Sequence, residues 1–427
     1  MRYPWIGCAL ALSLAVVACS GGKSGDDDDN GGASGDGGTG GSGGKAGTGG
    51  GTGAKGGTGG SGGTGGGSAG TGGSAGSGIT PIGTGPRAFP QNKALPHCTL
   101  TTVADASGKV QTAYNFWKST FVVSATGGLR VQRTENQNDT VSEGMGYGML
   151  IAVYMNDQAT FEGLWGFTKA HLDSVGLMTW HLNADGSVAT GGQGSATDAD
   201  EDIAFALIMA SVQWPSSTYL ADGAKMAKAI LMNEVAGDGM LKPGDNWGDS
   251  DKTYPDYFSP AYIRVFKKVA PHTFWDTVLT RNYEILAKVS GTYGLVPDST
   301  TATYALTESY KYDACRTPWR IGMDYCFNGT PEAKTYLTLV GGFFDSQGAV
   351  NIGDGYSLTG QKTSSFGNMA FVGPAGVAGM AGFPKLLDDA FTYGSSGTGG
   401  TTNYYQQTLR VITMLMMSGN LLDYSQL

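Results

Sequence analysis

The 427-residue sequence has few histidines, no Cys-x-x-Cys and no cluster of basic residues. No two of its four histidines stand at the spacing of metal ligands, which argues against a zinc site. The net charge is −9, and no run of lysine and arginine is dense enough to neutralise a phosphate backbone. We therefore expect no metal, no cofactor and no nucleic-acid partner.

The first fifth of the chain has too few apolar side chains to pack a core. Residues 20–86 consist mainly of Gly, Ser, Thr and Ala, with repeated Gly-Gly-Thr-Gly-Gly units. A stacked solenoid would need an apolar stripe, and this segment has none. We predict a disordered tether whose r.m.s. reach is on the order of 45 Å.

Residues 1–19 have the layout of an export signal, with a basic start at Arg2, a short apolar run and small residues before Cys19. The apolar run is too short to span a bilayer. Residues 16–19 resemble a bacterial lipobox, which predicts lipidation of Cys19 and anchorage to the cell envelope. Ser20 then resembles the permissive residue of outer-membrane lipoproteins. The alternative is an ordinary cleaved signal on a secreted protein.

Three further cysteines remain for an exported protein: Cys98, Cys315 and Cys326. An odd number allows at most one disulfide, and the sequence leaves its pairing open. Cys315 has no histidine nearby in sequence, which argues against a cysteine nucleophile.

Residues 87–427 show a succession of helical patterns separated by Gly, Pro, Asn and Asp. Apolar residues recur at intervals of three and four, and alternating strand patterns are scarce. Several of these stretches are apolar nearly all round, as expected of an inner layer that an outer layer covers. We predict one all-α domain of about a dozen helices. The clearest helical stretches are Gly148–Tyr154, Ile203–Val212, Ala224–Asn233, Phe274–Leu286 and Gln406–Met417.

An acidic run opens the stretch ATDADEDIAFALIMASVQW, residues 196–214. Asp198 stands where a helix N-cap belongs, and Glu201 three residues later would complete a capping box. Capping does not explain four acids in five residues. A calcium loop is a third interpretation, but Ile203 stands where such a loop needs glycine.

A second acid, Glu143, lies in VSEGMGYGMLIAV, just before a predicted helix. Three glycines surround it, and their missing side chains would let a bulky substrate approach. In an apolar cleft beside Met145 and Tyr147 its pKa would rise, as a general acid needs near neutral pH. The alternative is an exposed glutamate at a helix start.

A third acid, Asp313, lies in YKYDACRTPWRIGMDYCF, ahead of a helix start at Thr317-Pro318. Arg316 is close by, so an ion pair or a cap is one explanation. A solvent-reachable aspartate kept ionised by arginine also suits a base that activates water.

Together these segments resemble glycoside hydrolase family 8, formerly cellulase family D, over nearly all of residues 110–424. The resemblance implies an (α/α)6 barrel with a long acidic cleft across the N-terminal ends of its inner helices. It implies Glu143 as proton donor, Asp313 as base and Asp198 as the residue that holds and distorts the sugar. Such an enzyme inverts the anomeric centre, with carboxyl groups roughly 6.5–9.5 Å apart. Further matching stretches are GLMTWHLNADG (176–186), LKPGDNWG (241–248), GLVPD (294–298), GDGY (353–356) and YYQQTLRVITML (404–415).

The Tyr-Asp-Ala-x-Arg form at residues 312–316 is similar to the branch of the family that uses aspartate as base. Its motifs most resemble those of cellulases, which implies an endo-β-1,4-glucanase acting on cellulose or mixed-linkage β-glucan. One departure is Asn246, where arginine would be expected before Trp247. The alternatives are a xylanase or chitosanase of the same family, or a non-catalytic carbohydrate-binding lipoprotein.

Aromatic side chains can stack on the C–H face of a pyranose. The Gly- and Asp-rich surroundings of Trp180 and Trp247 favour sugar contact for these two tryptophans. We expect the polysaccharide to be the partner of a monomeric protein. Further predicted substrate contacts are Tyr147, Tyr312, Arg316 and Tyr405, whereas Trp117, Trp165, Trp275 and Trp319 are predicted to lie in the core.

Overall fold

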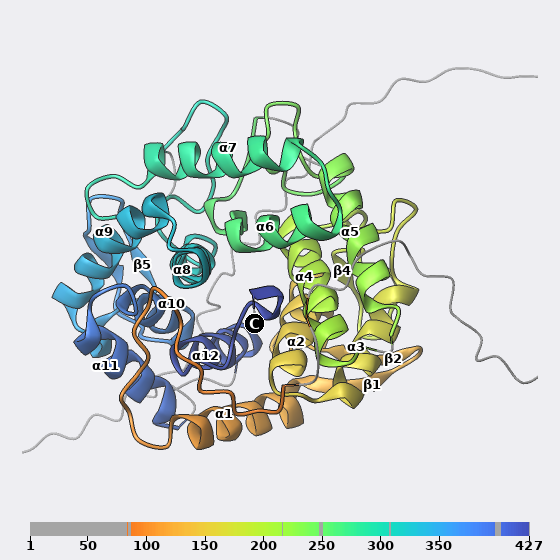
Figure 1. Cartoon of the computed structure of the whole chain (residues 1–427), viewed down its shortest axis with the longest axis horizontal. Helices are drawn as coiled ribbons and strands as arrows, with labels where there is room; N and C mark the ends of the chain where they lie inside the picture. The colour runs from red at the N-terminus through yellow and green to blue at the C-terminus, as the bar shows by residue number, and fades with distance from the viewer. Residues whose placement is uncertain are drawn as a thin grey trace, which may run out of the picture. The chain divides into compact units, whose positions relative to one another are not determined.

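The computed structural model describes Gly83 and residues 87–215, 217–246, 251–306, 309–397 and 403–426 (Figure 1). The predicted export signal, the lipidation site Cys19 and the tether apart from Gly83 lie outside these residues and stay predictions. Within the described ranges, no helix combines the length and the hydropathy that a membrane span requires.

Twelve α-helices make up most of the described residues, which confirms the all-α prediction and the expected number of helices. The five helical stretches named from the sequence lie in α2, α4, α5, α7 and α12. The helices are α1 (Ala106–Phe121), α2 (Ser142–Tyr154), α3 (Gln158–Ala170), α4 (Thr197–Gln213), α5 (Tyr219–Asn233), α6 (Pro260–Val269), α7 (Phe274–Val289), α8 (Thr317–Asn328), α9 (Pro331–Gln347), α10 (Met369–Gly379), α11 (Pro384–Ser395) and α12 (Tyr404–Met417).

The even-numbered helices form a closed inner ring, since each contacts the next and α12 returns to α2 (Figure 1). The odd-numbered helices pack outside this ring, each against a neighbouring inner helix. In α10 every residue is buried, and in α2 and α12 all but one are. Outer helices such as α5 and α11 bury only one side, because their other side is exposed to water. This alternation of apolar and amphipathic helices gives the predicted (α/α)6 barrel.

Six short strands form three antiparallel pairs at the ends of the helices. The β3–β4 pair joins the start of α2 to the segment that carries Trp180, because Val141 pairs with His181. The strands are β1 (Val122–Ala125), β2 (Gly128–Val131), β3 (Thr140–Val141), β4 (His181–Leu182), β5 (Gly355–Tyr356) and β6 (Lys362–Ser364), and short 3-10 helices are η1 (Pro255–Tyr257), η2 (Ala314–Arg316), η3 (Ala349–Asn351) and η4 (Tyr424–Gln426).

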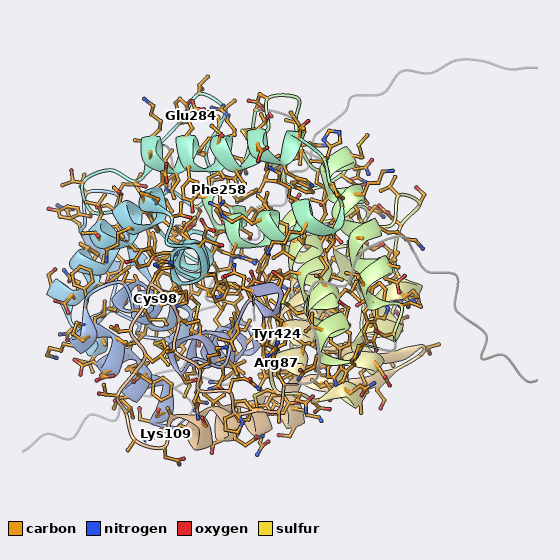
Figure 2. All side chains as sticks on the ribbon, in the orientation of Figure 1. Arg87, Cys98, Lys109, Phe258, Glu284 and Tyr424 are labelled. Carbon is orange, nitrogen blue, oxygen red and sulfur yellow. A yellow bond between two sulfur atoms is a disulfide. The ribbon has the colours of Figure 1, made fainter. Side chains whose placement is uncertain are left out.

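The C-terminal segment closes the barrel at the C-terminal ends of α2 and α4. Tyr154 donates its hydroxyl to the carbonyl of Leu422 at 2.6 Å. The Arg87 guanidinium lies 5.5 Å from the ring centre of Tyr424, and Figure 2 shows both side chains near the middle of the ring of helices. The opposite end, where the inner helices begin, is therefore the end left for a cleft.

A disulfide joins Cys98, which precedes α1, to Cys326 near the end of α8, and leaves Cys315 as a buried free thiol. The two bonded residues are 228 positions apart in the sequence. Closing so long a loop restricts the unfolded chain far more than the folded one. The structure thus shows which two of the three cysteines form the disulfide, a pairing that the sequence left open.

We expect the loss of this disulfide to lower the free energy of unfolding by about 2–5 kcal/mol. Thermal unfolding with and without a reducing agent measures the effect. The same reductant should barely change the midpoint of a Cys98→Ala/Cys326→Ala variant. An equal shift in both proteins would contradict the prediction.

Candidate active site

The N-terminal ends of the inner helices bring a group of polar side chains together. Because each helix start carries partial positive charge, this end of the barrel favours carboxylates. Glu143 and Asp198 lie in the first turns of α2 and α4. The other contributors are Asp256 in η1 ahead of α6, Asp313 directly before η2 and α8, Asn368 at the N-cap of α10, and Tyr404 and Tyr405 at the start of α12.

Arg316 lies at the centre of this group and contacts four carboxylates. Its Nη1 is 2.5 Å from Glu143 and 2.6 Å from Asp198. Its Nη2 is 2.5 Å from Asp256 and 2.9 Å from Asp313. One buried guanidinium therefore holds acids from four separate parts of the chain in a single arrangement.

The four carboxylates differ in their access to solvent. Asp198 and Asp256 are buried, with side chains 3% and 0% exposed. Glu143 is 20% exposed, and Asp313 is 45% exposed. Glu143 and Asp313 are thus the two acids of the group that a substrate and a water molecule can reach.

The separation of these two acids is limited by the arginine they share. Since each contacts a nitrogen of the same planar fork, their contacting oxygens lie no more than about 8 Å apart. This upper limit includes both the lower part of the roughly 6.5–9.5 Å range of an inverting pair and the about 5–5.5 Å of a retaining pair.

The environment of Glu143 raises the pKa of its carboxyl group to about 7. Burial is the largest cause, and the negative charges of Asp198 and Asp313 add to it. Arg316 and a hydrogen bond of 3.2 Å from the Tyr404 hydroxyl act in the opposite direction. Because burial dominates, a large fraction of Glu143 carries a proton near neutral pH.

The acidic run at the start of α4 points inward and does not cap the helix. The N-cap is Ala196, without a side-chain hydrogen bond, so the predicted capping box of Asp198 and Glu201 is wrong. Asp198 instead contacts Arg316, and Asp202 forms a buried two-contact ion pair with Arg320. Ion pairing inside the barrel took precedence over local capping.

Tyr312 and Tyr405 form an aromatic pair next to Asp313, with ring centres 6.1 Å apart. The Tyr405 hydroxyl donates to the carbonyl of Tyr312 at 2.5 Å, and the Tyr312 hydroxyl donates to Asp354 at 2.6 Å. Tyr312 is 40% exposed. A fixed and partly exposed ring beside the acids is suited to stack on a sugar.

Of the two tryptophans predicted to stack on sugar, the structure describes only Trp180. Trp180 is half-buried, with its indole N–H donating to the Gly191 carbonyl at 3.2 Å. Trp247 lies outside the described residues. The four tryptophans predicted for the core are confirmed as buried: Trp117, Trp165, Trp275 and Trp319.

Tyr147 and Arg316 require a correction, since both were predicted to contact substrate. Tyr147 is 0% exposed and packs edge-on against Trp319. Its hydroxyl lies 3.2 Å from Nη1 of Arg316, which is itself 2% exposed. Both lie beneath the carboxylates and support them. The glycines around Glu143 likewise serve packing, because a Cβ at Gly146 would lie 2.8 Å from the side chain of Asp202.

Sequence reasoning missed several members of the site. Asp256 follows a proline in an ordinary loop pattern, and only its burial beside Arg316 reveals it. Asp298 accepts hydrogen bonds of 2.9 Å from the backbone N–H groups of Lys311 and Ala314, on either side of Asp313. The matched GLVPD stretch, which ends at Asp298, was the one available signal for it.

A closed double ring of helices with paired carboxylates at its open end defines an all-helical glycoside hydrolase. Comparison with known proteins gives the family. The family model for glycosyl hydrolases family 8 matches residues 88–419. The chain belongs to this family.

Several relatives are similar over most of their length. Endoglucanase A of Acetivibrio thermocellus is 41% identical over 346 residues, covering 75% of this chain and 72% of that protein. Endoglucanase 2 of Ruminiclostridium josui is 39% identical, covering 78% and 76%. The solved structure of a β-1,3-1,4-glucanase from Paenibacillus sp. X4 has a TM-score of 0.73 at 31% identity, covering 80% of this chain and 99% of that one.

Proposed function

We propose that the protein is an inverting endo-β-1,4-glucanase that hydrolyses cellulose or mixed-linkage β-glucan, with Glu143 as general acid and Asp313 as general base. The observation that carries this proposal is that Glu143 and Asp313 contact the same Arg316 guanidinium but have different environments. One is mostly buried with a raised pKa, and the other is open to solvent. An acid that keeps a proton near neutral pH and a second carboxyl group that water can reach are what an acid and base pair requires.

In the proposed reaction, Glu143 gives its proton to the glycosidic oxygen as the bond from that oxygen to the anomeric carbon breaks. A water molecule attacks the anomeric carbon from the opposite face of the ring and passes a proton to Asp313. Arg316 keeps Asp313 in place through a contact of 2.9 Å. The product therefore leaves with its anomeric configuration inverted.

The substrate proposal rests on the relatives, whose names describe endoglucanases and a β-glucanase. A relative named as a reducing-end xylose-releasing exo-oligoxylanase is only 26% identical. Half-buried Trp180 and the Tyr312–Tyr405 pair supply aromatic faces for a chain of glucose units.

A reducing-sugar assay on carboxymethylcellulose, mixed-linkage glucan, xylan and chitosan tests the substrate. We expect release from the two glucans, and activity confined to xylan or chitosan would contradict the glucan assignment. NMR of the first product from a defined cello-oligosaccharide tests the mechanism. Inversion gives the α-anomer first, whereas an initial β-anomer would indicate a retaining pair about 5–5.5 Å apart.

Asp198→Asn should reduce turnover more than it weakens binding. Asp198 is buried against Arg316, so we propose that it acts on the sugar at the cleavage point through this arginine, which also holds Glu143 and Asp313. An interaction that strengthens in the transition state appears in kcat, and one that is equal in both states appears in KM. We expect a fall in kcat of about 10–100-fold with KM changed by less than about threefold. A higher KM at unchanged kcat would assign Asp198 to ground-state binding alone.

We further propose that the protein is exported and anchored to the cell envelope through Cys19, which the tether of residues 20–86 would hold away from the catalytic domain. The lipobox-like segment 16–19 and the polar residues that follow support this. Incorporation of labelled palmitate into the wild type, and its loss in Cys19→Ser, would test the anchor. An unlabelled wild type would favour the secreted alternative.

A further inference from the structure

Asp200 and Glu234 are two buried acids that the proposed reaction does not use. Asp200 lies in the first turn of α4, and Glu234 directly follows α5. Both residues are 0% exposed, and their carboxyl groups are within hydrogen-bonding contact of each other. This pair accounts for one of the acids in the run that opens α4.

Each carboxyl group has one oxygen with a donor and one without. Asp200 accepts from the backbone N–H of Met178 at 2.8 Å, and Glu234 accepts from the Ser195 hydroxyl at 2.5 Å. The remaining oxygens, Oδ2 of Asp200 and Oε2 of Glu234, accept no hydrogen bond in the described structure, and the Thr197 hydroxyl close to Glu234 donates to the Lys242 carbonyl at 2.7 Å. Two carboxylates in contact repel each other unless a proton lies between them.

The charged groups that act on the pair do not neutralise it. Asp173, Asp245 and Glu201 are acidic neighbours whose negative charges act on the pair. The Lys242 ammonium group donates to the carbonyls of Asn233 and Asp245, at 2.7 and 3.0 Å. No cluster of three metal ligands exists among the residues that the structure describes. Burial raises the pKa of Glu234 to about 8 and that of Asp200 well above its usual value.

The pair connects three segments near the candidate active site. Met178, which donates to Asp200, is two residues from Trp180. The backbone of Trp180 donates to Gly194 and accepts from Ser142, the residue before Glu143, both at 2.8 Å. Ser195, which donates to Glu234, also bonds Asp245 through its backbone N–H at 2.9 Å.

We propose that Asp200 and Glu234 share one proton, and that the protonated pair is a pH-sensitive clamp that positions the Trp180 segment and the loop around Asp245. While the proton is present, the two carboxyl groups hold α4 and the end of α5 together. Loss of the proton leaves two buried like charges in contact, and the segments separate. The role in sugar positioning rests on the proposed function, whereas the shared proton does not.

The sign of the pH effect follows from the folded-state pKa, which lies above that of the unfolded chain. The stabilisation is complete below the unfolded value and disappears as the pH rises to about 8. In Glu234→Gln, an amide N–H replaces the shared proton and does not titrate. The unfolding equilibrium constant of the wild type, relative to this variant, should rise about tenfold per pH unit between roughly pH 5 and 8.

Thermal and urea unfolding of the full-length protein across this pH range tests the shared proton. Asp200→Asn should behave like Glu234→Gln, because either amide supplies the missing donor. Glu332→Gln, at an exposed position in the first turn of α9, is the control and should follow the wild type. Curves for both pair variants that run parallel to the wild type would overturn the proposal, as would failure of both to fold.

Steady-state kinetics on mixed-linkage glucan tests the clamp separately. Between about pH 7 and 9, KM of the wild type should rise several-fold while KM of Glu234→Gln stays level. Equal KM profiles would overturn the positioning role and leave the shared proton intact. If neither protein hydrolyses any glucan, the proposed function fails, and the unfolding curves still decide whether the proton is shared.

Discussion

Glu143→Gln should lower kcat on mixed-linkage glucan by about 10²–10⁴-fold, the share of the rate that a general acid supplies. Glutamine has nearly the shape of glutamate but has no proton to give to the departing oxygen. Its amide can still accept from the Tyr404 hydroxyl, which lies 3.2 Å from Oε1 of Glu143. Initial-rate kinetics measure the loss, and circular dichroism with thermal unfolding shows whether the fold is kept.

The pH profile gives this prediction a second measurement. Glu143 acts as an acid only while protonated, and its pKa is raised to about 7. The wild-type kcat/KM should therefore fall as the pH rises above about 7, and the residual activity of the variant should lack this limb. Unchanged kcat would mean that another group is the acid. Equal oligosaccharide binding without product from either protein would favour a non-catalytic binding protein.

Asp313→Ala should cause a loss of similar size, about 10²–10⁴-fold in kcat, because no carboxylate then takes the proton from the attacking water. Asp313 is 45% exposed, so its removal opens space that solvent and small anions can enter. Azide needs no base to attack the anomeric carbon. We expect added azide to restore part of the activity and to yield a glycosyl azide with inverted configuration.

The matched control for azide is Glu143→Ala. This variant lacks the acid but keeps the base, and an external anion does not replace a missing proton donor. We expect no recovery with natural substrate. Recovery in Glu143→Ala but not in Asp313→Ala would exchange the roles of the two residues. A stable Asp313→Ala variant with near wild-type turnover would remove Asp313 from the mechanism.

The sequence by itself determined the helical architecture and singled out three of the four acids that contact Arg316. The stretches in α2 and α4 are apolar nearly all round, as inner helices are, and amphipathic helices such as α5 cover them. The order and spacing of the motifs around Glu143, Asp198 and Asp313 then indicated the family. These are properties of short segments, which periodicity and local motifs express directly.

The tertiary structure alone decided how the acids are held. Arg316 contacts four carboxylates from distant parts of the chain. No local sequence pattern predicts that Asp256 is one of them. Tyr147 looked like a cleft residue beside glycines but is packed against Trp319. The pairing of Cys98 with Cys326 was likewise open until the fold brought them together.

The physical reason is that burial and charge pairing depend on which helix starts meet across the barrel. Asp198 suits an N-cap locally, but in the closed barrel it lies inside the first turn of α4 and contacts buried Arg316. The partners of the acidic run at the start of α4 were likewise decided by the tertiary structure. Its members face Arg316, Arg320 and Glu234, three partners that lie at least 32 positions away in the sequence and meet it only in the closed ring.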